Sequence, residues 1–313
     1  MGRKQANRLI VAALIGSVAL AAGPVASADP FPIKDGDRIV LGGPTFIERD
    51  VRYGCIETLL TAQFSDYALT FRNLGWSGDN VFGIARASFD PIPKGYERLI
   101  KQIKDAAPTV LIMSYGHNES FKGREGLDEF IAGYNTLLDD VSELNARTIL
   151  ISPTLQQDMG EPLPDPAKHN EDVRIYAAAI NALAEERDFR FIDLTTALTL
   201  PKERPLSHWT DNGLHFTEAG YWKVASTIIE ALGYTIVQAS TTEITRIQRV
   251  VNEKNRLFFL KWRPQNETYI TGFRKHEQGQ HVAEIPLFDP LVTEQEEKIA
   301  ALRIALSQGG AGK

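Results

Sequence analysis

Residues 38–48 read RIVLGGPTFIE, and this stretch decides the fold. It begins as a short apolar run typical of buried strands, and its paired glycines indicate a tight turn before the residues that follow. Four further apolar runs of the same kind lie at residues 69–75, 109–116, 147–153 and 189–194. Together with the run at residues 38–43, they predict five strands.

Between these runs, apolar residues recur at the spacing of one helix face. One such set is Ile56, Leu59, Leu60 and Phe64. The last helix of the series is expected from Thr217, its N-cap, to Leu232, with Gly233 ending it. Strands that alternate with helices form parallel sheets covered on both faces. The sequence therefore predicts an α/β fold: a three-layer α/β/α sandwich around a doubly wound, flavodoxin-like sheet of five parallel strands.

The amino-terminal segment has the three parts of a secretory signal peptide. Arg3, Lys4 and Arg8 precede an apolar stretch at residues 9–22, and Ala26-Ser27-Ala28 offers a small-residue cleavage site. The apolar stretch is shorter than the roughly 20 residues of a membrane-spanning helix. We therefore expect residues 1–28 to be removed on export, and the protein to be periplasmic or extracellular without a membrane anchor.

Charge and cysteine content narrow the function further. The formal net charge is −6, and it becomes −9 once the three basic residues of the signal peptide are removed. Such an acidic chain is a poor partner for nucleic acid. Cys55 is the only cysteine, so no internal disulfide is possible, and we expect this side chain to be a small buried hydrophobe.

The composition of the sequence becomes more polar after Gly233. A polar helical stretch from Thr242 to Leu260 precedes an irregular segment and an acidic helix from about Thr293 to Leu306. We interpret residues 29–235 as one domain and residues 236–313 as a C-terminal helical extension, with a disordered tail from Gln308 to Lys313. The extension holds a cluster of planar and hydrogen-bonding side chains that either seals it to the domain or binds a sugar or carboxylate. The cluster comprises Trp262, Arg263, Asn266, Tyr269, Arg274 and His276.

Four expected strand ends and helix starts carry unusual residues. They read GPTFIE at residues 43–48, NLGWSGD at 73–79, GHNE at 116–119 and DNGLH at 211–215. In order and spacing they resemble the four blocks of the SGNH (GDSL-like) hydrolases, which read Gly-Asp-Ser with a trailing Glu, Asn-x-x-x-x-Gly-Asp, Gly-x-Asn-Asp and Asp-x-x-His. The similarity covers Ile39 to about Leu232, and its first and last blocks are degenerate. It implies a metal-independent ester hydrolase of the SGNH fold that needs no cofactor.

The resemblance also assigns roles to residues. Thr45 takes the place of the nucleophilic serine, His215 that of its base, and Gly78 and Asn118 those of oxyanion-hole donors. Such a site needs a hydroxyl beside an imidazole, and N–H groups aimed where negative charge develops on the carbonyl oxygen. A glycine at position 78 leaves its backbone N–H open to a ligand, and Thr45 can add its own N–H.

The first block departs from the family pattern at two positions. Thr45 bears a secondary hydroxyl with restricted rotamers, which makes attack harder. Pro44 replaces the family's acidic residue but leaves the Thr45 N–H intact. A register shifted by one would place Pro44 itself at the nucleophile position and remove the hydroxyl. Glu48 matches the family only in the first register, which we therefore prefer.

The last block departs at the acid that orients the histidine. The family acid lies three residues before the histidine, and that position here is Asn212. Asp211 lies one residue further away, and Asp193 at the end of the fifth expected strand is a third candidate. An asparagine orients an imidazole but cannot stabilise imidazolium by charge, so Asp211 is the preferred partner.

The histidines outside this block do not predict a metal site. His117 and His208 lack a ligand spacing such as His-x-x-x-His, and no phosphate-binding glycine loop follows the first strand.

Three functions follow from the sequence. The first is an exported esterase acting on a small-molecule or polysaccharide ester, with acyl groups on carbohydrate as one substrate class. The others are a catalytically impaired carbohydrate- or ester-binding protein and an acyltransferase. The sequence gives no oligomeric state.

Overall fold

The structure is a computed structural model, and it describes residues 29–198 and 209–310. The predicted signal peptide, His208 and residues 311–313 lie outside the described residues. No helix of the described residues is long and apolar enough to cross a bilayer.

Five parallel strands form one sheet in the order β2-β1-β3-β4-β5. The strands are β1 (Arg38–Gly42), β2 (Thr70–Asn73), β3 (Val110–Met113), β4 (Arg147–Ile151) and β5 (Arg190–Ile192). Each lies within one of the apolar runs, so the predicted doubly wound α/β fold is confirmed. The order reverses between β1 and β3, and ligands of such sheets bind outside the carboxyl ends of the strands at this point.

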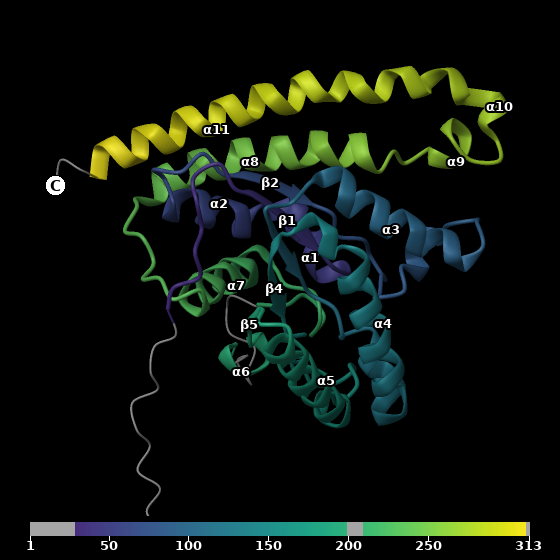
Figure 1. Ribbon diagram of the computed structural model, residues 1–313. Coiled ribbons are helices and arrows are strands. Elements are labelled where there is room, and N and C mark those ends of the chain that lie inside the picture. Colours follow the sequence, from purple (N-terminus) through teal and green to yellow (C-terminus); the bar gives the residue numbers. More distant parts are fainter. Residues whose placement is uncertain (1–28, 199–208, 311–313) are drawn as a thin grey trace, which may run out of the picture.

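Side chains that alternate along β1 divide the core into two layers. Ile39 and Leu41 face one side of the sheet and Val40 the other, because successive side chains of a strand point to opposite faces. The first layer is closed by α1 (Thr45–Tyr53), α2 (Cys55–Gln63), α6 (Leu194–Ala197) and α7 (Glu218–Ala231). The second is closed by α3 (Ile92–Ala106), α4 (Leu127–Asp140) and α5 (Ala167–Glu186). Figure 1 shows these helices on either side of the sheet.

Several local predictions agree with the structure. The Thr217 side chain caps α7 by accepting from the Gly220 N–H at 3.3 Å, and Gly233 follows the helix with φ of +90°. Cys55 is buried at the start of α2, and this burial raises the pKa of the thiol. Short 3-10 turns complete the connections: η1 (Ile84–Ala87), η2 (Glu119–Gly126) and η3 (Ser142–Leu144).

The C-terminal extension consists of two long helices that lie side by side along the β2 edge of the sheet (Figure 1). They are α8 (Thr241–Trp262) and α11 (Phe288–Gly310), with α9 (Glu267–Ile270), α10 (Lys275–Gln278) and η4 (Gly279–Leu287) between them. The buried Lys254 of α8 donates to the Glu57 carboxylate at 2.7 Å and to the Phe71 carbonyl of β2 at 3.2 Å. The extension therefore satisfies a polar group of an edge strand that would otherwise be open to solvent.

The predicted disordered tail is wrong in its first part. The helix α11 continues to Gly310, three residues into the segment expected to be disordered from Gln308. Leu306, which lies two residues before Gln308, packs with Ile247 and Ile299. An established helix adds residues at little cost once its earlier turns are held.

Candidate active site

A small cavity lies at the carboxyl ends of β1 and β3, where the strand order reverses. Its volume is about 100 Å³. Thr45, Asn118 and His215, which come from three distant segments, all line it, and the walls between them are largely aromatic or apolar. The wall residues include Phe46, Tyr115, Phe121, Leu214 and Tyr221. Three of the residues that sequence reasoning selected therefore line one cavity, whereas Gly78 and Asp211 do not line it.

Thr45 is the first residue of α1 and directly follows the β1 turn. Its hydroxyl accepts a hydrogen bond from the backbone N–H of Gly78 at 3.1 Å. Its own N–H lies in the first turn of the helix and has no acceptor among the described residues, so it is available to a ligand oxygen. Pro44 contributes only its carbonyl, which accepts from Ile47 and Glu48. The Thr45 hydroxyl therefore lies between the Gly78 loop and the cavity that Thr45 lines.

The loop that carries Gly78 is held tightly against the loop of Thr45. Gly78 has φ of +74°, a conformation that strains any residue with a Cβ. A Cβ at Gly75 would lie 2.1 Å from the backbone nitrogen of Glu48, so only glycine permits this approach of the two loops. The Asn73 side chain links the same loops by donating to the Ile47 carbonyl at 2.8 Å.

Asn118 reaches the cavity from the loop after β3. Its amide nitrogen donates to the Asp79 carbonyl at 2.6 Å, which ties the third block to the second. The buried Glu119 makes a further tie, because its carboxylate accepts from the N–H groups of Val81 (2.9 Å) and Gly116 (3.0 Å). Burial raises the pKa of Glu119, although these N–H donors oppose the effect.

A buried ion pair between Arg86 and Asp79 stabilises the loop that carries Gly78. Arg86 donates to the Asp79 carboxylate at 2.7 Å and to the Leu74 carbonyl at 2.9 Å, and both charged side chains are fully buried. The hydroxyl of Tyr115 donates to the same carboxylate at 3.2 Å. Burial raises the pKa of Asp79, with Arg86 opposing it. Arg86 and Tyr115 both contact Asp79 Oδ2, whereas the buried Oδ1 has no hydrogen-bond partner among the described residues, so the polar network under the donor side is only partly satisfied.

The histidine side of the cavity is held differently. Asn212, and not Asp211, lies within hydrogen-bond distance of His215: its amide nitrogen is 3.1 Å from Nδ1. The Asn212 amide oxygen accepts from the N–H groups of Leu214 (3.1 Å) and His215 (2.9 Å), which fixes the orientation of the amide. An amide nitrogen can only donate, so Nδ1 must accept and the ring proton must lie on Nε2.

Asp211 was the preferred partner, but it faces mainly away from the ring. One carboxylate oxygen forms an ion pair with Arg49 at 2.6 Å, and the other lies 3.9 Å from His215 Nδ1. Asp193 instead caps α6 by accepting from the Thr196 N–H at 3.0 Å. Burial lowers the pKa of His215, the Arg49 cation lowers it further, and Asp211 opposes both. The His215 imidazole therefore stays neutral down to a lower pH than that of an ordinary histidine.

Among the described residues, no hydrogen bond joins the Thr45 hydroxyl to His215, although both line the cavity. The candidate oxyanion donors are the Thr45 N–H, the Gly78 N–H, which here donates to the Thr45 hydroxyl, and the Asn118 amide, which has one hydrogen left after its bond to the Asp79 carbonyl. The arrangement also places a hydroxyl within the same cavity as an imidazole. These are the groups that acyl transfer needs. The unprotonated ring nitrogen, Nδ1, is however already bonded to the Asn212 amide.

Sequence reasoning missed Arg49, and it weighed His117 only as a metal ligand. Both line the cavity. Arg49 lies four residues after Thr45, so a helix starting at Thr45 would have placed both on one face. His117 is packed beside His169 with ring centroids 5.4 Å apart. Its pKa is lowered to about 4, mainly by burial and then by the neighbouring His169, so this imidazole stays neutral. No group of three potential metal-ligating side chains converges within the described part of the chain.

Two residues of the polar cluster of the extension have the predicted sealing role. Arg263 stacks on the Trp76 ring at 3.8 Å and pairs with the Glu48 carboxylate at 2.7 Å. The same carboxylate accepts from the Ser77 N–H, next to Gly78. Trp262 packs edge-on against Trp76 as well. These two residues therefore seal the extension to the loop of the oxyanion donor.

The remaining residues of that cluster lie elsewhere. Tyr269 and Arg274 bond to each other at 2.7 Å, and Asn266 bonds to Gln278 at 3.0 Å. None of them lines the cavity, so the cluster does not form a ligand site over Thr45.

Several solved structures are similar to this chain. The chain is similar to an acetylxylan esterase from Geobacillus stearothermophilus, solved as a catalytic mutant (17% identity, TM-score 0.50, 66% of this chain and 99% of that one). The same esterase without a stated mutation aligns with 20% identity and a TM-score of 0.49 over the same shares. A gut microbial diltiazem-metabolizing enzyme aligns with 17% identity and a TM-score of 0.49, over 65% of this chain and 48% of that one.

At these identities, the likeness to solved structures shows the fold alone. No curated protein matches the sequence. The model of the GDSL-like lipase/acylhydrolase family, however, matches residues 36–223, which is more than half of the chain and includes all four blocks. The chain therefore belongs to the GDSL-like lipase/acylhydrolase family of ester-hydrolysing enzymes.

Proposed function

We propose that the protein is an esterase in which Thr45 is the nucleophile and His215 its base, with the oxyanion bound by N–H groups of Thr45, Gly78 and Asn118. The convergence of these groups on one cavity is the observation that carries the proposal. The Thr45 oxygen attacks the ester carbonyl carbon, and His215 passes the hydroxyl proton to the leaving alcohol. Water then attacks the acyl-threonine, again with His215 as base, which releases the acid and restores the hydroxyl.

The tautomer of His215 sets the rate in this proposal. A base must present an unprotonated Nε2 to the hydroxyl, but Asn212 stabilises the ring with its proton on that nitrogen. Catalysis therefore requires the less favoured tautomer, and the imidazolium that forms has no hydrogen-bonded carboxylate. In a serine protease the corresponding Asp-to-Asn change lowers kcat by about 10⁴. We accordingly expect a slow esterase.

The substrate we propose is a short acyl ester of a carbohydrate outside the cytoplasm. The cavity of about 100 Å³ has largely aromatic and apolar walls, which suits a small acyl group better than a long chain. The acetylxylan esterase of similar fold, and the signal-peptide features of residues 1–28, are consistent with an exported carbohydrate esterase.

The decisive experiment compares three proteins with the same substrates. Wild type, Thr45→Ala and His215→Ala are assayed with p-nitrophenyl acetate, p-nitrophenyl octanoate and acetylated xylan. We expect wild type to prefer the acetate ester, and both variants to lose activity to near the uncatalysed rate. Activity that survives both substitutions would refute the assignment, and equal rates with octanoate would refute the short-acyl specificity.

A second candidate function is binding of an acylated glycan without turnover. The Asn212 amide favours it, because the tautomer inferred for His215 lets Nε2 donate to a ligand oxygen and leaves no free ring nitrogen to accept a proton. This alternative predicts that acetylated oligosaccharide binds unchanged for hours at equilibrium, and that Asn118→Ala weakens binding. Release of acetate by wild type, measured by NMR, would exclude it.

A further inference from the structure

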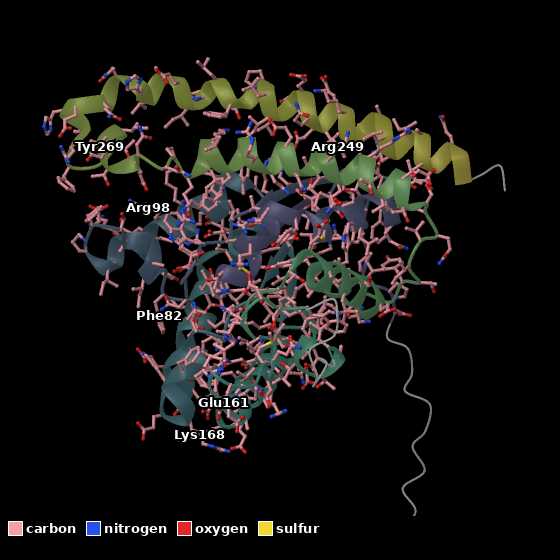
Figure 2. The ribbon with its side chains drawn as sticks, turned by 180° about the vertical axis from the view of Figure 1, so that it is seen from behind. Phe82, Arg98, Glu161, Lys168, Arg249 and Tyr269 are labelled. Carbon is pink, nitrogen blue, oxygen red and sulfur yellow. The ribbon has the colours of Figure 1, made fainter. Side chains whose placement is uncertain are left out.

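A second and larger concavity lies beside the candidate site, between α1 and α8. Its volume is about 640 Å³. The residues that α8 contributes are spaced by one helical turn, so they share one face of the helix. The groove residues used below are Arg49 and Arg52 of α1, and Arg249, Arg256 and Phe259 of α8. Figure 2 labels Arg249 on this long helix.

The groove is basic although the protein is acidic. Four arginines and two glutamates line it, whereas the formal net charge of the chain is −6; of the glutamates, Glu48 pairs with Arg263 and Glu253 with Arg256. Arg256 is neutralised by a two-point contact with Glu253, at 2.7 and 2.9 Å, and Arg49 by Asp211. Arg52 and Arg249 are exposed and have no ion-pair partner among the described residues. Two guanidinium groups thus remain open to an anion.

One residue links the groove to the candidate active site. Arg49 lines both the cavity that holds Thr45 and the groove, and Phe259 gives the groove an apolar wall. A polymer that occupied both the cavity and the groove would pass Arg49 between them. Guanidinium groups bind carboxylates through two parallel hydrogen bonds, a geometry that lysine cannot reproduce.

We propose that this groove binds an anionic stretch of polysaccharide, whose carboxylate or sulfate groups contact Arg52 and Arg249. The proposal rests on the esterase function for the identity of the polymer, and it deepens that function by naming the substrate class as acidic glycan esters. Carboxylates along the chain supply the charge, and the sugar faces pack on Phe259.

The test uses an unesterified probe, so that binding does not depend on hydrolysis. Hexagalacturonate and the neutral xylohexaose are titrated calorimetrically into the whole chain at low ionic strength. We expect hexagalacturonate to bind and xylohexaose to bind at least about tenfold more weakly, with the difference shrinking as salt screens the charges. Arg52→Gln combined with Arg249→Gln should weaken hexagalacturonate at least about tenfold, because two charge-assisted contacts are lost.

The matched control removes two exposed positive charges from α5, through Lys168→Gln combined with Arg174→Gln. Figure 2 shows Lys168 and Arg249 at opposite ends of the molecule, so the control changes the net charge equally but leaves the groove intact. Unchanged affinity in the control and loss in the groove variant support the proposal. Equal affinity of the groove variant and wild type, or equal loss in both variants, overturns it.

Two further arms separate the possible failures. Thr45→Ala should bind hexagalacturonate as wild type does, so the groove is tested even if no esterase activity is found. Conversely, a wild-type protein that hydrolyses acetate esters but does not bind hexagalacturonate would refute only the groove. A single-stranded oligodeoxynucleotide of equal charge tests whether the groove binds nucleic acid instead of an anionic polysaccharide. If it binds as tightly as hexagalacturonate and is weakened by the same substitutions, the carbohydrate assignment is wrong.

Discussion

The two sides of the cavity are built on different principles. The donor side uses three loops joined by buried bonds, and its supporting charges, Asp79 and Arg86, are both 0% exposed. The base side is one loop in which Asn212 bonds to its own neighbours, and the nearest carboxylate, Asp211, is 46% exposed. The first side is therefore preorganised for an anion, while the second holds its imidazole in the tautomer that cannot accept a proton from a hydroxyl.

This contrast teaches that anion stabilisation and proton transfer are separable in this fold. Residues of the donor side contact one another across long sequence separations, so altering one disturbs the others. His215 depends mainly on residues within four positions of it. We expect substitutions on the donor side to affect stability and rate together, and substitutions on the base side to affect rate alone.

Arg86→Met gives the largest expected effect. It leaves the Asp79 carboxylate buried without its charge partner, and breaking a buried pair in this way costs about 3–5 kcal/mol of unfolding free energy. Urea denaturation measures it. Lys94→Gln, which breaks the exposed pair with Glu97, is the control and should cost less than about 1 kcal/mol. Similar losses in both variants would contradict the special role of the donor side.

Asn118→Ala should reduce kcat by about 10²–10³ through loss of one oxyanion donor. Its bond to the Asp79 carbonyl is worth only about 1 kcal/mol of stability, so the fold survives. Steady-state kinetics with p-nitrophenyl acetate tests this, and KM should change little. A raised KM with unchanged kcat would show that Asn118 binds substrate and not the transition state.

Asn212→Asp should raise kcat, by at least about tenfold, since it reverses the exchange that lowers kcat in serine proteases. One carboxylate oxygen can keep the bonds from the Leu214 and His215 N–H groups, and the other replaces the amide nitrogen 3.1 Å from Nδ1. The ring proton then moves to Nδ1 and frees Nε2. Asn212→Ala is the control and should not raise kcat. An Asp variant no faster than wild type would contradict this account of the tautomer.

The sequence predicted the fold more completely than the site. Five apolar runs specified the strands, because burial on both faces requires continuous apolar residues. The resemblance of the four blocks predicted that Thr45, Asn118 and His215 would meet, and these three residues line one cavity. The choice of Asn212 over Asp211 could not be predicted, since it depends on the path of the backbone around Leu214 and on the pairing of Asp211 with Arg49.

The contact of Arg263 with Glu48 was equally inaccessible to the sequence, because the two residues are far apart in the chain and either could have paired elsewhere. It tests whether the extension positions the oxyanion loop. Arg263→Met should lower kcat by about tenfold with KM unchanged, because displacement of the Gly78 N–H weakens transition-state binding. Arg263→Lys keeps the charge and should recover part of the loss. A change confined to the melting temperature would show that the contact is only structural.

Arg49→Gln gives the smallest expected effect, a shift in pH dependence. The Arg49 cation lowers the pKa of His215, so its removal raises that pKa, and the freed Asp211 acts in the same direction. Because the neutral imidazole is the base, the acidic limb of kcat/KM for p-nitrophenyl acetate should move to higher pH, by less than about one unit. A shift to lower pH would contradict the assignment of this limb to His215.

The tautomer of His215 can be observed directly. A long-range ¹H–¹⁵N spectrum of the uniformly ¹⁵N-labelled protein, recorded well above the pKa of the ring and assigned by comparison with His215→Ala, distinguishes protonated from unprotonated ring nitrogens. We predict that wild type carries its ring proton on Nε2 and that Asn212→Asp carries it on Nδ1. A wild-type spectrum with the proton on Nδ1 would contradict the claim that Asn212 holds this imidazole in the tautomer unable to accept the Thr45 proton.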